Sequence, residues 1–383
     1  MKALRKLVDK VKPTFSKGGK LGFLHSTFDA FETFLFVPNT TTKHGTHVRD
    51  CNDIKRTMIT VVIALVPCLL FGCYNTGIQV GLEGWMAFFY GLLRILPMIA
   101  VSYIVGLGIE FTVAQWRGHE VNEGFLVSGL LIPLVMPVST PLWMVGLGTA
   151  FAVIFGKEIF GGTGMNIFNP AVLARAFVFF AYTPQMSGES VWYSNWEMLG
   201  VQATDVTTGA TALEQLASTG SMQWSALDAF LGFIPGSFGE TSTLAILIGA
   251  AILLHTGVAS WKTMVSVFVG GLAMAYLFDA IDGGALSSHE GFEPYMHLLV
   301  GGFAFGAVFM ATDPVTSAQT STGKYIVGFM TGALAILIRE VNPAYPEGMM
   351  LSILFMNALA PLVDYFVVEA NIRRRKNRVK IAK

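Results

Sequence analysis

The chain has 383 residues, of which 53% are apolar and 13% are charged, and its formal net charge is zero. Soluble globular proteins carry about 25% charged residues, so this composition excludes an ordinary soluble domain, a disordered segment and a disulfide-stapled secreted module. The zero net charge excludes a nucleic-acid-binding protein, and the three cysteines form no Cys-x-x-Cys pair for zinc or an iron–sulfur cluster.

Basic residues are concentrated at the two ends of the chain. Of the 25 Lys and Arg, 11 lie in residues 1–56 and seven lie in residues 373–383. Lys and Arg favour the cytoplasmic side of a membrane, so we expect both termini in the cytoplasm and an even number of spans. The first 20 residues contain seven Lys and Arg and no apolar run that would make them a signal peptide.

Ten apolar segments approach the length of about 20 residues that a membrane-spanning helix requires. In chain order they cover residues 57–76, 86–113, 124–139, 141–156, 165–182, 241–257, 260–280, 295–312, 324–339 and 347–370. The short segments around Pro137, Asn169–Pro170 and Pro314 are expected to be broken or tilted helices. Before and after the ten segments we expect a basic N-terminal region, 1–56, and a basic tail, 371–383.

The charges of the connections agree with this orientation. The external connection 183–240 contains six acidic residues and neither Lys nor Arg. The basic residues near the other connections all fall on the cytoplasmic side: Arg117, Lys157, Lys262 and Lys324. We therefore expect a multi-pass membrane protein with both termini in the cytoplasm.

Three short motifs recur in the same order in the two halves of the apolar region. The pairs are Met136–Thr140 with Thr312–Ser317, Lys157–Glu158 with Arg339–Glu340, and Phe168–Ala171 with Val341–Ala344. Chance recurrence at helix ends is the alternative explanation. Five spans per half is an odd number, so a true second copy has to be inverted in the membrane, as in many transporters. The sequence thus predicts an all-α polytopic membrane protein of two inverted five-helix repeats, 57–182 and 241–370.

The external connection contains the motif Asp-Val-Thr-Thr-Gly-Ala-Thr at residues 205–211. One interpretation is structural: Thr211 caps a short helix, with Glu214 three residues later completing a capping box. The other begins with the same geometry, because a helix N-terminus favours a phosphate group. Gly209 and Ala210 leave the Thr211 hydroxyl accessible to a large partner.

This motif resembles the covalent flavinylation motif of membrane redox subunits. Other segments agree with that resemblance: Thr46–Asp50, His119–Gly124, Phe160–Asn166, Pro235–Glu240 and Asn342–Gly348. Together they resemble the family that contains the B subunits of sodium-translocating NADH:quinone oxidoreductases and the D subunits of Rnf complexes. The longer basic N-terminal region favours the quinone-reductase branch over the Rnf branch.

The resemblance implies a redox function and several roles. A flavin transferase would join FMN through its phosphate to Thr211 after recognising Asp205, Thr208, Gly209 and Ala210. Riboflavin would be bound non-covalently, with contacts that the resemblance leaves unassigned. The chain would belong to a six-subunit complex of the bacterial inner membrane that passes electrons from NADH-derived flavins to quinone and couples this transfer to Na⁺ translocation. NADH oxidation would lie on another subunit, because this chain has no dinucleotide-binding fingerprint.

The resemblance also implies a quinone region at Gly106–Glu110. Its pair of adjacent glycines is incomplete here, since Leu107 follows Gly106 and the second glycine is Gly108. A carboxylate in lipid is costly and is usually functional, so Glu110 is a candidate proton relay. Pairing with Arg117 or with a lipid headgroup is the alternative.

Five further positions are candidates for cofactor or ion binding. Asp313 and Asp364 are acidic residues inside spans and could form a Na⁺ path, although Asp313 could equally cap a half-helix. Arg175 could hold a flavin phosphate or pair with an acid such as Glu158. Gly161 and Gly162 could admit a flavin or simply a neighbouring helix.

A channel or transporter without a cofactor is the competing functional class. The motif that ends at Thr211 separates the two classes, because such a transporter has no need for it.

Overall fold

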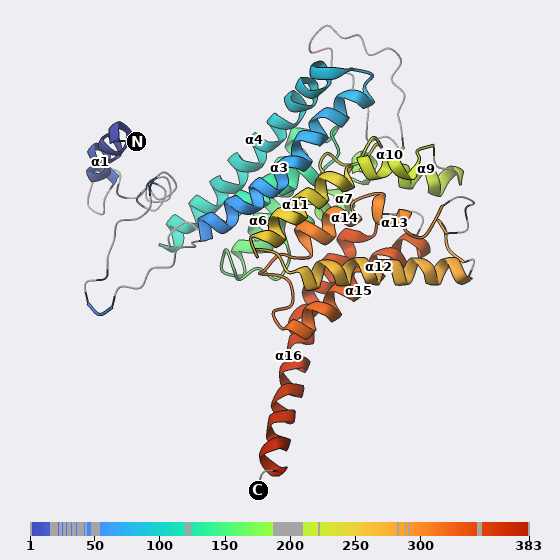
Figure 1. Cartoon of the computed structure of the whole chain (residues 1–383). Coiled ribbons are helices and arrows are strands. Elements are labelled where there is room, and N and C mark those ends of the chain that lie inside the picture. The colour runs from blue at the N-terminus through green and yellow to red at the C-terminus, as the bar shows by residue number, and fades with distance from the viewer. Residues whose placement is uncertain are drawn as a thin grey trace.

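The computed structural model describes residues 2–15, 54–118, 124–186, 210–220, 223–281, 283–287, 289, 292–342 and 347–381, together with single residues between 22 and 46. Throughout these residues the regular secondary structure is helical (Figure 1). This agrees with the predicted all-α fold class.

Five helices are long and apolar enough to cross a membrane. They are α3 (Ile54–Gln79), α4 (Gly84–Arg117), α12 (Trp261–Ile281), α15 (Ser321–Val341) and α16 (Met349–Ile381). They establish a polytopic helical membrane protein.

The other predicted segments are shorter or interrupted helices. They are α5 (Phe125–Val135), α6 (Leu142–Val153) with the π-helical turn η2 (Ile154–Glu158), α7 (Pro170–Ala181), α11 (Thr243–His255), and α13 (Met296–Leu299) with α14 (Phe303–Phe305) and the π-helical turn η3 (Gly306–Met310). Every predicted apolar segment therefore contains helix. That all ten cross the membrane, as two inverted repeats, stays a prediction.

The helix breaks have local causes. The Asn169 side chain accepts hydrogen bonds from the amides of Ala171 and Val172, and Pro170 occupies the first helical position, so α7 begins there and not at residue 165. The predicted segment before Pro314 is broken at residues 300–302, where Gly301 has a φ of 70° after the end of α13, and the chain is again non-helical around Pro314, between η3 and α15.

Close helix packing depends on small residues. A Cβ atom on Gly270 would lie 2.1 Å from the carbonyl oxygen of Phe329, and one on Gly332 would lie 2.0 Å from that of Val267. The backbones of α12 and α15 therefore touch, as small residues permit in membranes.

The outer surface of the long helices is suited to lipid. Trp85 and Trp116 are 78% and 86% exposed near opposite ends of α4. They lie about 45 Å apart along an ideal helix, close to the thickness of a bilayer with its headgroups. Tryptophan is enriched at such interfaces.

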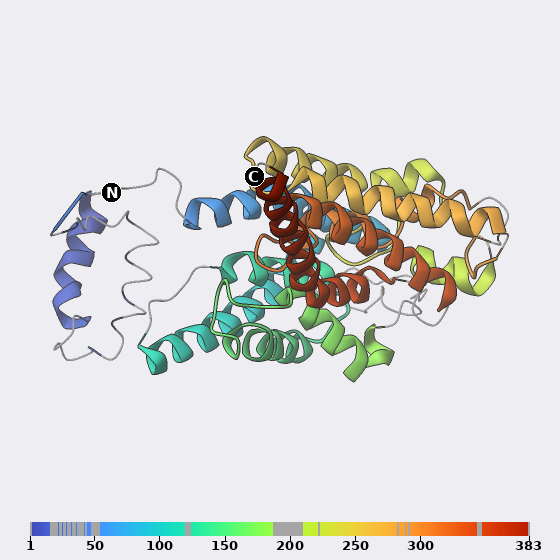
Figure 2. The ribbon, with the colours of Figure 1, turned by 90° about the horizontal axis from the view of Figure 1, so that it is seen from below.

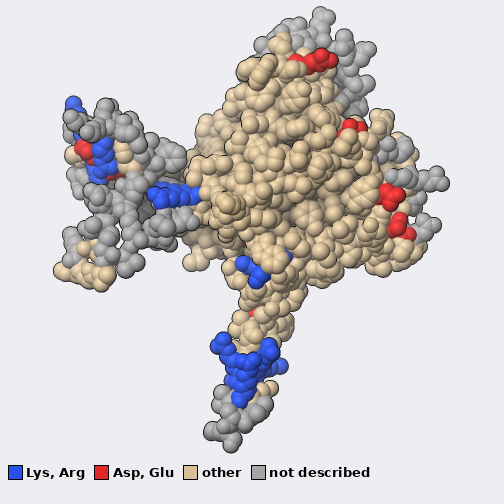
Figure 3. Space-filling view, viewed as in Figure 1, with Lys and Arg blue, Asp and Glu red and all other residues tan. Residues whose placement is uncertain are grey.

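The remaining helices are α1 (Lys2–Phe15), α8 (Thr183–Met186), α9 (Ala212–Thr219) and α10 (Ala226–Leu231). Helix α1 lies apart from the main body, and α16 extends away from it (Figures 1 and 2). On the face shown in Figure 3, Lys and Arg gather on α1, the start of α3 and the end of α16, whereas most Asp and Glu of the main body lie toward the opposite edge. This separation agrees with the expected orientation in the membrane.

Candidate functional site

Thr211 is the N-cap of α9, as the sequence predicted. Its Oγ1 accepts a hydrogen bond of 3.3 Å from the backbone amide of Glu214, and the side chain is half-buried. Ala210 precedes it in an equally half-buried position. The predicted recognition residues Asp205, Thr208 and Gly209 lie outside the described residues. A phosphate on this hydroxyl would sit at a helix N-terminus, where the helix dipole favours negative charge.

Helix α9 packs on the break between α13 and α14. A Cβ atom on Gly301 would lie 2.6 Å from Leu213, so the start of α9 rests directly on the broken backbone. The apolar cluster beneath it contains Ala212, Leu213, Leu216, Ala229, Ile234, Leu286, Phe292, Met296 and Val300. Thr211 is therefore held on a packed platform.

A group of charged residues, which we call the Arg339 cluster, lies under this platform; it comprises His297, Arg339 and Glu340. Arg339 is fully buried and donates hydrogen bonds to the carbonyls of His297 (2.6 Å), Val300 and Glu347 (both 3.1 Å). These bonds cap the C-terminal end of α13, whose carbonyls otherwise lack helical partners.

Glu340 completes the Arg339 cluster. One carboxylate oxygen accepts hydrogen bonds from the amides of Leu286 and Ser287, and the other accepts from the Ser287 hydroxyl at 2.6 Å. Nε2 of His297 lies 2.9 Å from this second oxygen. Both oxygens of the buried carboxylate are thus satisfied.

Arg175 on α7 connects the two halves of the chain. Its guanidinium lies 2.6 Å from Glu347 and 3.4 Å from Glu240, and it also donates to Ser237 and to the carbonyl of Val135. The predicted pairing of Arg175 with an acid is therefore formed, with Glu240 and Glu347 in place of the suggested Glu158, and a flavin-phosphate role stays a prediction.

Glu110 on α4 forms a buried ion pair with Lys157 in η2. Each side chain is 5% exposed. The predicted alternative partner Arg117 is wrong, since Arg117 is exposed at the end of α4. Lys157 was expected in an aqueous connection, but η2 turns it back into the protein interior. Lys157 also lies 6.0 Å from the ring centre of Phe125.

Gly106 lies one turn before Glu110 and faces the same neighbours. A Cβ atom on Gly106 would lie 1.9 Å from the Phe125 ring, whereas one on Gly108 would meet nothing within 4 Å. Gly106 is therefore required for close packing of α4 against α5. Gly106 and Glu110 both face the protein interior rather than lipid.

Gly161 and Gly162 form the turn after η2. Their φ angles are 121° and 98°, which favour glycine, and the amide of Gly162 donates to the carbonyl of Lys157. Neither glycine packs closely against a neighbouring helix. Helix packing, one of the two predicted alternatives, is therefore not formed among the described residues, the approach of a flavin stays a prediction, and both glycines belong to the turn that follows Lys157.

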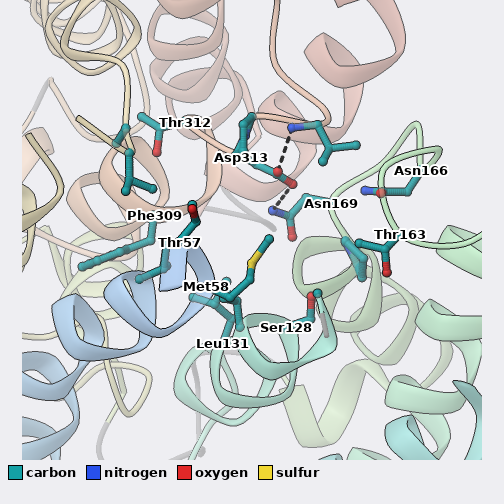
Figure 4. Close-up of a pocket in the computed structure, with 18 of the residues that line it drawn as sticks. Thr57, Met58, Ser128, Leu131, Thr163, Asn166, Asn169, Phe309, Thr312 and Asp313 are labelled. Carbon is teal, nitrogen blue, oxygen red and sulfur yellow. Dashed lines mark hydrogen bonds between the residues drawn. The ribbon is translucent and has the colours of Figure 1, made fainter. Parts of the chain in front are cut away.

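Asp313 lines a cavity between the two halves (Figure 4). The cavity has a volume of about 100 Å³. The Asp313 carboxylate accepts hydrogen bonds from the side chains of Asn169 and Thr316, both 3.2 Å, and from the amide of Val315 at 3.0 Å. It therefore stabilises the turn that contains Pro314, and it also contacts the other half through Asn169.

Other walls of the cavity come from α3, α5 and η2. The polar residues from these elements are Thr57, Ser128 and Lys157, and the turns before α7 and after η3 add Thr163, Asn166 and Thr312. Figure 4 shows Asp313 and Asn169 facing one another at the wall of this space. Lys157 thus joins the Glu110 pair to the cavity that Asp313 lines.

Asp364 has a local structural role. Its carboxylate accepts hydrogen bonds from the amides of Gln319 (2.6 Å) and Thr320 (3.0 Å) and from the Thr320 hydroxyl. It fixes the start of α15 to α16. It does not line the cavity that contains Asp313.

Sequence reasoning missed two residues that the fold makes important. Lys157 was counted as a loop charge, although it is one of only seven basic residues outside the tails. His297 is fully buried in the Arg339 cluster. The available signal for both was an ionisable residue inside or beside an apolar segment.

The fold and these sites define a class: a polytopic membrane protein whose two halves meet at buried ionisable groups. The sequence model of the NQR2, RnfD, RnfE family matches residues 41–373, and the chain belongs to this family.

Named relatives extend over almost the whole chain. The B subunit of the Na(+)-translocating NADH-quinone reductase of Chromohalobacter salexigens is 47% identical over 406 residues, covering 98% of this chain and 96% of that protein. The corresponding B subunits of Stutzerimonas stutzeri and Pseudomonas aeruginosa are each 46% identical, covering 97% of this chain and 98% of each relative. These relatives are subunits of an oxidoreductase.

Proposed function

We propose that this chain is the subunit of a Na⁺-translocating NADH:quinone reductase that carries FMN on Thr211 and passes electrons toward quinone. The full-length similarity to the B subunits of such enzymes supports this choice over the Rnf branch of the same family. The remaining partners are the other subunits, a quinone, Na⁺ and a flavin transferase.

The single observation that carries the cofactor proposal is the position of Thr211. Its Oγ1 accepts one hydrogen bond and is half-exposed at a helix N-terminus, so it can be esterified while the N-terminal amides of α9 hold the phosphate. Bound there, the flavin would supply one- and two-electron transfer. The residues of this chain fix its attachment point, because α9 is packed on α13 and the Arg339 cluster fixes α13.

The contacts of Glu110 and Asp313 bear on their proposed roles in quinone reduction and in the Na⁺ path. The sequence left open a proton relay and an ion pair, and the ion pair is formed, with Lys157. For Glu110 to deliver a proton to quinone near Gly106, this pair has to open. We retain Asp313 as the candidate for the Na⁺ path, since it lines the cavity between the halves. For Asp364 and for the riboflavin site, no further role is proposed.

We also propose that the protein lies in the inner membrane with both termini in the cytoplasm. The cavity then opens near the cytoplasmic start of α3, and α9 with Thr211 lies on the external side.

The cofactor proposal is tested by ultraviolet fluorescence of the denatured subunit in a gel. The wild-type band should fluoresce and Thr211→Ala should not, because alanine has no oxygen for the phosphoester. Thr219→Ala, at the other end of α9, is the matched control and should fluoresce. A fluorescent Thr211→Ala band would contradict the assignment, and a dark wild-type band would favour a cofactor-free transporter.

A further inference from the structure

The buried pair of Glu110 and Lys157 is incomplete. The Lys157 ammonium contacts Oε1 of Glu110, while Oε2 is buried and has no hydrogen-bond partner in the part of the chain that the structure describes. A buried carboxylate oxygen without a donor is costly, so this pair is held less completely than a structural ion pair requires.

Asp313 has hydrogen-bond donors but, unlike Glu110, it has no cationic partner among the described residues. Its three hydrogen-bond donors, from Asn169, Val315 and Thr316, are all neutral, and no salt bridge joins it to a cation among the described residues. It lines the same cavity as Lys157. Ionised, it would be a buried charge without a counter-ion.

The ionised carboxylates of Glu110 and Asp313 therefore outnumber the cations beside the cavity by one. Lys157, which pairs with Glu110, is the one cationic residue that lines the cavity among the described residues, and Asp313 lines it without a counter-ion. The cavity volume of about 100 Å³ exceeds the roughly 10–15 Å³ that a cavity needs to hold one water molecule, so the cavity has room for a small cation. Carboxylate, amide and hydroxyl oxygens are the ligands of hard cations.

The side chain and the backbone of Lys157 both suit a change of partner. Its ammonium is a point charge on a flexible four-carbon stem, unlike the planar guanidinium of Arg. It belongs to a π-helical turn, a geometry that is frequent at functional sites, and two glycines with positive φ follow it.

We propose that Lys157 is an internal cation that alternates between Glu110 and Asp313 and thereby expels the transported monovalent cation. With Lys157 on Glu110, as in the structure, Asp313 accepts a Na⁺ ion from the cavity. When the ammonium moves to Asp313, it takes the place of the ion, which leaves the carboxylate. The inference rests on the proposed function, because it assumes that the cation is transported.

The test uses the assembled complex in proteoliposomes, with the NADH:quinone reductase rate and ²²Na⁺ uptake measured against Na⁺ concentration. Lys157→Met keeps an unbranched side chain, shorter by one atom, and removes its charge. We expect the KM for Na⁺ to fall by about tenfold or more, equal to about 1.4 kcal/mol, because the competing cation is gone. The rate at saturating Na⁺ should also fall, because nothing expels the ion. Lys262→Met, whose exposed ammonium contacts Ser321, is the control and should leave both values unchanged.

A second variant separates movement from static neutralisation. In Lys157→Met/Glu110→Gln the two lost charges cancel, so this variant carries the test if Lys157→Met alone fails to assemble. The inference predicts that the double variant keeps the low KM for Na⁺ and the low rate. If Lys157 only neutralises Glu110, the double variant should recover the wild-type KM for Na⁺, and that result would overturn the inference; the maximal rate does not separate the two explanations, because Glu110 is itself a candidate proton relay.

Different results would overturn the role of Lys157 and the proposed function. A Na⁺-stimulated wild type with an unchanged KM in the variants overturns the role of Lys157 alone. A wild-type complex with neither Na⁺ stimulation nor ²²Na⁺ uptake overturns the proposed function and the inference together.

Discussion

Two buried cations occupy matching positions in the predicted repeat but have different surroundings. Lys157 and Glu158 in one half correspond in sequence to Arg339 and Glu340 in the other. Arg339 donates to three carbonyls and both carboxylate oxygens of Glu340 accept hydrogen bonds, so these two charged groups are held at several points, although the ring nitrogens of His297 form no hydrogen bond among the described residues. Lys157 contacts one carboxylate oxygen, leaves the other unpartnered among the described residues, and lines a cavity.

The difference shows how side-chain chemistry assigns a structural or a mobile role. A guanidinium presents five donors in a rigid fork, so it can fix several carbonyls at once. The Arg339 cluster uses this property to hold the platform under Thr211. An ammonium is a single charge that can exchange partners, and Lys157 has two carboxylates near one cavity.

Arg339→Gln should produce the largest effect, because it removes the buried cation that has a fixed structural role. The carbonyls of His297 and Val300 would lose their donor, and we expect a destabilisation of about 3 kcal/mol or more, with loss of assembled complex. Arg339→Lys should not restore assembly, because one ammonium cannot reach three carbonyls. The yield and thermal stability of the purified complex measure this, with the exposed Arg373→Gln as the control. Full assembly of Arg339→Lys would contradict the fixed role.

Much of the first-order architecture could be predicted from the sequence. Apolar run length located every helix-containing segment, and the order of Thr211 and Glu214 located the cap of α9. The partners of buried charges could not be predicted, because they depend on tertiary contacts between distant segments. Glu110 meets Lys157 and Arg175 meets Glu347 only after the helices have packed.

The position of Asp313 was ambiguous for a related reason. Its proximity to Pro314 indicated both a cap and an ion ligand, and the structure shows a turn-stabilising carboxylate that also lines a cavity. Asp364 carried the same sequence signal but contacts the start of α15.

Glu110→Gln should have the next largest effect and tests whether Lys157 exchanges between two carboxylates. Lys157 would lose its first carboxylate and stay on Asp313, so the rate at saturating Na⁺ should fall to the Na⁺-free rate. The readout is quinone reduction over a Na⁺ series, beside NADH oxidation by a soluble acceptor. A loss of about 10²–10⁴-fold in quinone reduction at every Na⁺ concentration would instead support a proton relay at Glu110.

Gly106→Ala tests whether the packing around Glu110 is as tight as the contacts indicate. The new methyl group would overlap Phe125, so we expect a destabilisation of about 1–3 kcal/mol. Gly108→Ala is the matched control on the same helix and should be neutral or slightly stabilising, because alanine favours helix. Equal thermal stability of the two variants would show that α4 and α5 are not packed as described.

Cysteine labelling has the smallest effect on the protein and tests whether the two regions lie at opposite membrane faces. In a variant with Cys51 replaced by Ser, we expect Ser218→Cys on α9 to react with an impermeant thiol reagent from outside the inner membrane. Thr256→Cys, at the exposed end of α11, should react only after that membrane is opened. Labelling of both cysteines from the same side would contradict the predicted orientation.

The exchange of Lys157 between two carboxylates is tested most directly by cryo-electron microscopy of the complex in saturating Na⁺ and in Na⁺-free buffer. We predict Lys157 on Glu110 and cation density at Asp313 in Na⁺, and Lys157 on Asp313 without Na⁺. Arg339 should keep the same three carbonyl contacts in both. A Lys157 ammonium that stays on Glu110 in both conditions would contradict the account.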